Sequence, residues 1–186
     1  MINLRKFEPR EFGSKVSGNM DEKCAEVEAQ IGGELPNSLL SFLKEFSGTS
    51  VIFEKDVNYK PLVASPWARK DGTQCLEMLF GLADEKTGLA AQYRRYHDRV
   101  PSGVIPIGEA PGGNLICLAV GGSNMGSIFL WDHEDERPIT GNDSSDFGNM
   151  YKAATSFDDF VAALIDDGRV HPKSNGIVSA WLADDL

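Results

Sequence analysis

The sequence has few cysteines and no long apolar run. Cys24, Cys75 and Cys117 are spread over 186 residues, and such an odd, widely spaced set fits neither a disulfide framework nor paired zinc ligands. No segment approaches the roughly 18 apolar residues of a membrane-spanning helix. Glu8 and Glu11 interrupt the apolar core that an export signal would need. These absences predict a protein of the reducing cytoplasm.

The chain also lacks an excess of basic residues. It has 18 Lys and Arg against 28 Asp and Glu, a formal net charge of −10, whereas proteins that neutralise phosphates carry a basic face. The balance excludes direct nucleic-acid binding and favours a basic protein partner, although it can also serve solubility alone. Between positions 132 and 146 there is one base, Arg137, among six acids: Asp132, Glu134, Asp135, Glu136, Asp143 and Asp146.

Apolar periodicity predicts four helices. The first covers Asp21 to Ile31 and ends at Gly32-Gly33, and the second follows Pro36, with Asn37 or Ser38 as its cap. A third covers Gly88 to His97. The fourth begins at Ser156, with Asp159 as a weak capping-box partner, and ends at Gly168.

Short runs of β-branched and aromatic residues predict the strands. Pro106 suits a strand end or an edge strand, and the glycine turns after it indicate a meander of adjacent antiparallel strands. The predicted strands are Val51–Phe53, Leu62–Ala64, Leu76–Phe80, Val104–Ile107, Leu115–Val120 and Gly126–Asp132.

Together these elements predict one α+β domain over residues 1–186, with a mostly antiparallel central sheet flanked by N-terminal and C-terminal helices. Its core spans about residues 20–167, and residues 170–186, which include Trp181, form a C-terminal appendage.

The sequence contains no complete motif of the catalytic sites for which we searched it. Gly108 to Gly113 has the spacing of a phosphate-binding loop, but Asn114 stands where the lysine is needed, and Ser123 lacks the closing glycine of a nucleophile elbow. His97, His133 and His171 are far apart, and neighbouring strand residues around His133 point to opposite faces, which disfavours metal chelation. We therefore expect no catalytic residue, no metal and no cofactor.

Four segments carry a family resemblance: the helix Leu35-Pro36 to Ser47-Gly48, the strand pair Ile105 to Leu118, the strand Gly126 to Glu134, and the helix start Ser156-Phe157 to Phe160. In this order they resemble the SUKH superfamily, which includes a yeast cell-wall assembly regulator and many bacterial immunity proteins. The chain departs from that pattern at Asn114, where the family usually has an acid, and in a longer segment from Lys55 to Thr87.

The resemblance implies a non-catalytic binding module, an immunity protein that inactivates a cognate bacterial toxin of nuclease or deaminase type by direct contact. An acidic surface would steer such a basic partner. A regulatory scaffold without a toxin partner, and a metal or small-ligand activity at His133, are the alternatives. Trp131 can instead be a core residue, since large aromatic side chains usually pack in the interior. The predicted contact surface consists of Glu109, Trp131, His133, Glu134, Asp135, Glu136, Asp143 and Asp146.

Overall fold

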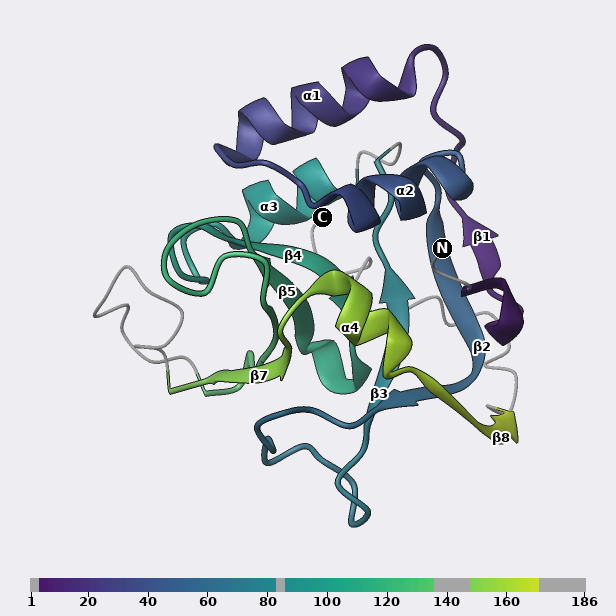
Figure 1. Ribbon diagram of the computed structural model, residues 1–186, viewed down its shortest axis with the longest axis vertical. Coiled ribbons are helices and arrows are strands. Elements are labelled where there is room, and N and C mark those ends of the chain that lie inside the picture. The colour runs from purple at the N-terminus through teal and green to yellow at the C-terminus, as the bar shows by residue number, and fades with distance from the viewer. Residues whose placement is uncertain (1–3, 83–85, 136–147, 171–186) are drawn as a thin grey trace, which may run out of the picture.

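An eight-stranded antiparallel sheet forms the centre of the molecule in a computed structural model that describes residues 4–82, 86–135 and 148–170 (Figure 1). Seven strands lie in chain order across the sheet, and the eighth pairs with β2 beside this path. The predicted α+β fold with an antiparallel sheet is confirmed. The strands are β1 (Arg10–Phe12), β2 (Ser50–Tyr59), β3 (Gln74–Leu79), β4 (Val104–Glu109), β5 (Leu115–Ala119), β6 (Ile128–Trp131), β7 (Met150–Ala154) and β8 (Ile165–Val170).

The described residues form four α-helices beside the sheet: α1 (Met20–Ile31), α2 (Asn37–Glu45), α3 (Leu89–Tyr96) and α4 (Phe157–Ala162). Gly32 ends α1 in the left-handed conformation, and the Ser156 side chain accepts a hydrogen bond from the Asp159 N–H at the start of α4. The predicted caps at Asn37 or Ser38 were wrong. Pro36 occupies the cap position of α2 without a side-chain hydrogen bond. Within the described ranges there are also two short 3-10 helices, η1 (Leu4–Phe7) and η2 (Pro111–Gly113).

Aromatic contacts join α2, α4 and the sheet into one core. The ring centroids of Phe42 and Phe157 are 6.1 Å apart, and those of Tyr59 and Phe160 are 4.9 Å apart. Figure 1 shows α4 crossing in front of the sheet while α1 and α2 lie together at one end. The apolar stripes predicted on both helices are buried as expected: Leu39, Phe42, Leu43 and Phe46, then Phe157, Phe160, Val161 and Leu164.

Two predicted boundaries were wrong because backbone pairing across the fold decides them. Leu62–Ala64 is not a strand of the sheet, although the N–H groups of Leu62 and Val63 donate to carbonyls of β7. The last helix ends at Ala162 rather than at Gly168, since the chain then turns to pair as β8 with β2. The predicted appendage lies outside the described residues apart from Val170.

Pro106 lies in a central strand, not at an edge as predicted. β4 pairs with β3 on one side and with β5 on the other. The register with β5 shifts between Pro106 and Gly108, which places Pro106 at a bulge. A bulge tolerates a residue without an N–H group, because the ladder is already interrupted there. None of the helices in the described residues combines the length and the hydropathy of a membrane-spanning segment.

Candidate binding site

The tight turn between β4 and β5 holds His133 by hydrogen bonds, and His133 itself follows the end of β6. Asn114 is 1% exposed, and its Oδ1 accepts from the His133 backbone N–H at 3.2 Å and contacts ring atom Nδ1 at 3.0 Å. Because an amide oxygen only accepts, Nδ1 carries the hydrogen in this contact, which leaves Nε2 for other interactions. Gly113 has a φ of 82°, and a Cβ there would lie 3.4 Å from Cε1 of the imidazole. The turn therefore holds His133 through Asn114, and a side chain at position 113 would crowd the ring.

A cavity of about 240 Å³ lies beside this turn and contains two of the predicted contact residues, Glu109 and His133. Glu109 comes from the end of β4, and Gly113 and Leu115 add the turn and the start of β5. α3 packs against β4 and supplies another wall through Tyr96. The site thus forms beside α3, where β4 and β6 end and β5 begins.

Three basic residues that the sequence did not connect with the site also line this cavity: Lys86, Arg95 and Arg99. The Arg99 guanidinium lies 5.3 Å from the Tyr96 ring centroid and 5.1 Å from that of Trp131, within the range of cation–π attraction. The sequence carried one usable signal. Gln92, Arg95, Tyr96 and Arg99 follow helical spacing, and all four reach the cavity.

Trp131 is completely buried, so its place in the predicted contact surface was wrong. Its ring centroid lies 5.8 Å from that of Tyr96 and 6.5 Å from that of His133. Together with Arg99, these side chains pack on the indole. Burying a large aromatic ring contributes strongly to the core, and the alternative reading of Trp131 as a core residue holds.

Glu109 is a half-buried carboxyl in a mixed electrostatic setting. Removal from water raises the pKa of Glu109, the negative charge of Glu77 raises it further, and the guanidinium of Arg95 acts in the opposite direction. Glu109 therefore takes up a proton more readily than an exposed glutamate.

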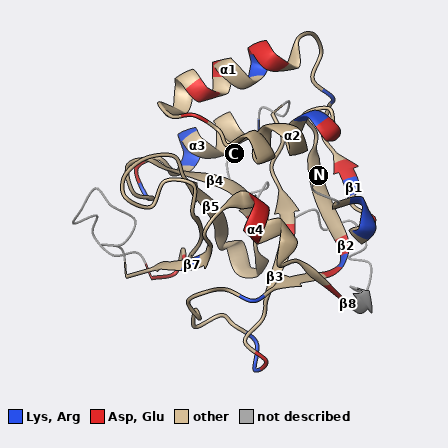
Figure 2. Ribbon diagram, in the orientation of Figure 1, with Lys and Arg blue, Asp and Glu red and all other residues tan. Residues whose placement is uncertain are grey.

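The acidic residues after β6 divide between core and surface. Asp132 is 5% exposed and its Oδ1 accepts from the Glu134 N–H, whereas Glu134 is exposed and Asp135 is half-buried. Figure 2 shows acidic and basic residues interspersed over the described chain, with basic residues on α3 and acidic ones on α4. The predicted contact residues Glu136, Asp143 and Asp146 lie outside the described residues.

The three cysteines of the chain are not placed as reactive nucleophiles. Cys24, Cys75 and Cys117 are buried, and burial raises the pKa of the Cys117 thiol far above the range in which a thiolate forms. His133 bonds to an amide rather than to a carboxylate or a nucleophile. The described residues contain no group of three or more His, Cys, Asp or Glu side chains arranged to hold a metal ion.

Two comparisons relate this geometry to known proteins. The model of the SMI1/KNR4 family (SUKH-1) matches residues 19–163. The SPbeta prophage-derived uncharacterized protein YokK of Bacillus subtilis (strain 168) is 37% identical over 183 residues, which cover 94% of this chain and 90% of YokK.

Proposed function

The chain belongs to the SMI1/KNR4 family (SUKH-1), and from this premise we propose that it is an immunity protein. In this proposal it is a non-catalytic module that neutralises a cognate bacterial toxin, of nuclease or deaminase type, by direct binding. The superfamily includes such immunity proteins. The prophage origin of the Bacillus relative is compatible with a role in conflict between bacteria and mobile elements.

The observation that carries the proposal is the chemistry of the cavity at the end of β6. It presents a carboxyl (Glu109), an imidazole nitrogen (His133) and a guanidinium (Arg95). These groups recognise polar and charged side chains through hydrogen bonds and ion pairs. Aromatic and arginine side chains are the residue types that dominate binding energy at protein interfaces. The arrangement supports recognition rather than turnover.

The proposed contact surface is centred on Glu109, His133, Glu134 and Asp135, and it extends to Glu136, Asp143 and Asp146 on the grounds of sequence alone. A chain with a net charge of −10 attracts a basic protein over several ångströms and raises the association rate. The cations of α3 limit this attraction to one side of the cavity. The surface therefore discriminates by charge pattern and not only by net charge.

The test is co-purification with the product of the adjacent gene, followed by measurement of the affinity. Replacing Glu134 and Asp135 by lysine should weaken binding about tenfold or more, mainly through a slower association rate that depends on salt. The matched control is the pair Glu22→Lys and Glu34→Lys, two exposed acids at and just beyond the ends of α1, which changes the net charge equally. Equal effects of the two pairs, or no effect of either, would contradict the proposed surface.

The mixed charge of the cavity favours one alternative, a regulatory scaffold whose partner need not be basic or toxic. Gene context separates the two functions. A neighbouring toxin gene, with loss of protection when the chain is deleted, supports the immunity protein. A stand-alone gene whose product captures a housekeeping assembly protein supports the scaffold.

A further inference from the structure

A second cleft, of about 290 Å³, opens between the β2–β3 connection and the turn that holds His133. Trp67 comes from the connection, and Pro111 and Asn114 come from the turn. Asn114 is the residue that bonds His133, and its neighbour Gly113 lines the first cavity. The two hollows therefore share one turn. The volume lies just under the roughly 300–1,000 Å³ of small-molecule sites and suits a single protruding side chain.

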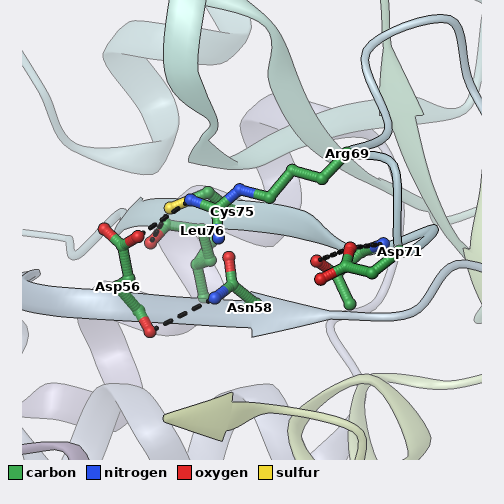
Figure 3. A network of polar contacts seen from close by, with 7 residues as sticks. Asp56, Asn58, Arg69, Asp71, Cys75 and Leu76 are labelled. Atoms are coloured by element: carbon green, nitrogen blue, oxygen red, sulfur yellow. Dashed lines mark hydrogen bonds and ion pairs between the residues drawn. The ribbon is translucent and has the colours of Figure 1, made fainter. Parts of the chain in front are cut away.

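The β2–β3 connection is fixed by an ion pair and hydrogen bonds, although Trp67 is 44% exposed. The Arg69 guanidinium pairs at 2.9 Å with Asp56, a carboxylate of β2 that is 5% exposed. In Figure 3 the Arg69 side chain extends from the connection toward Asp56, and Asp71 closes a local turn. The Ser65 hydroxyl accepts from the Trp67 N–H and from the Gln74 amide. Trp67 is thus presented in one place without a partner having to order the loop.

Two side chains with acceptor oxygens, Gln74 and Glu77, line the cleft. Gln74 is 4% exposed, and its Oε1 is buried without a hydrogen-bond donor. Buried acceptors without a donor are rare in folded proteins and require an explanation. Glu77 adds a carboxylate, and Leu130 and Pro111 add apolar surface. Arg69, the basic residue of this cleft, is engaged by Asp56.

We propose that this cleft receives one arginine side chain of a protein partner. The guanidinium would donate to Glu77 and to Gln74 Oε1, and its plane would stack on the Trp67 indole. Arginine fits better than lysine because it is planar, weakly hydrated and able to donate in two directions. The inference rests on the proposed function in that it assumes a protein partner, and it adds a named anchor outside the predicted contact surface.

The experiment uses a small probe, so that it does not depend on the identity of the partner. N-acetyl-L-arginine amide is titrated into the full chain, and the Trp67 indole and Gln74 side-chain amide signals are followed by NMR. We expect saturable shifts with a dissociation constant of about 1–10 mM, as for a single side chain. The citrulline analogue, which has the same shape without the charge, should bind about tenfold more weakly.

Single substitutions test which residues of the cleft bind the arginine probe. Trp67→Ala should weaken arginine binding about fivefold, and Glu77→Gln about tenfold. Leu62→Ala is the matched control, because Leu62 is 62% exposed on the same connection and does not line the cleft. Thermal melts establish that each variant is folded.

Each outcome decides one proposal. The absence of saturable shifts, or equal binding of arginine and citrulline, overturns the arginine cleft. If a toxin partner binds the parent and Trp67→Ala equally, the cleft is again excluded while the immunity function stands. Arginine binding without any toxin partner supports the cleft and leaves the proposed function to fail on its own test.

Discussion

Asn114 anchors His133 through one oxygen atom, which lies 3.2 Å from the backbone nitrogen and 3.0 Å from ring atom Nδ1. The two residues are 19 positions apart, and the contact joins the β4–β5 turn to the end of β6. It also separates the two hollows of the surface, since His133 lines one and Asn114 the other. Changes at this contact should affect both stability and binding.

Replacing Asn114 by alanine removes the acceptor for two buried or half-buried donors. We expect the free energy of unfolding to fall by about 1–3 kcal/mol, measured by urea denaturation. Asn114→Asp keeps an oxygen acceptor at this position and should retain more of the stability than alanine does at neutral pH. If alanine and aspartate variants are equally stable, the hydrogen bonds to His133 do not contribute to folding.

Glu109 should make stability depend on pH. Its pKa is raised in the folded state, first by burial and then by Glu77, so the folded protein binds a proton that the unfolded chain releases earlier. The stabilisation is complete below the ordinary carboxyl pKa of 4.5 and is lost as pH rises through the folded value. Glu109→Gln should therefore melt at a higher temperature than the parent at pH 7, and the difference should disappear below the ordinary pKa.

The control for Glu109 is Glu134→Gln, because Glu134 is exposed. A surface substitution of this kind changes the free energy of unfolding by no more than about 0.5 kcal/mol at either pH. A parent that is more stable than Glu109→Gln at pH 7 would show that Arg95 outweighs burial at this carboxyl.

Local signals predicted most of the fold, and long-range pairing decided the remainder. Ser156 and Gly32 carry their capping chemistry in the sequence, and both act as predicted. The strand β7 was not predicted, because Met150–Ala154 has a lysine and two alanines and is extended through its pairing with β6. β8 was not predicted for the same reason. Asp166 and Gly168 disfavour a strand, and pairing with β2 makes the segment extended.

The sequence predicted only those features of the site that come from one continuous segment of the chain. Glu109 and His133 flank the glycine turns of the meander, and they share a cavity in the structure. Arg99 and Trp131 are 32 positions apart in the numbering, and nothing in either segment indicates that the guanidinium lies over the indole. The orphaned Oε1 of Gln74 depends on how Ser65 and Trp67 fold back. Such features follow from packing and not from composition.

The ion pair between Arg69 and Asp56 should stabilise the β2–β3 connection. Asp56 is nearly completely buried, so Arg69→Met leaves a carboxylate with less compensation than before, at a cost of about 1–3 kcal/mol. The double variant Arg69→Met with Asp56→Leu should regain part of that loss, which a double-mutant cycle measures. Strictly additive losses would show that the two side chains are not coupled.

Substitutions at Trp131 distinguish a role in the core from a role in partner binding. The indole has no exposed surface, and in the described structure its Nε1 has no hydrogen-bond acceptor. Trp131→Ala should lower the free energy of unfolding by about 3–5 kcal/mol, and Trp131→Phe should cost less because a ring remains and the unpaired N–H is removed. Trp67→Ala, at a half-exposed tryptophan, should leave stability nearly unchanged and weaken partner binding. Denaturation curves and affinities measured on the same samples test both predictions. A Trp131→Phe variant that is folded but does not bind the partner would show that Trp131 contributes to the contact surface.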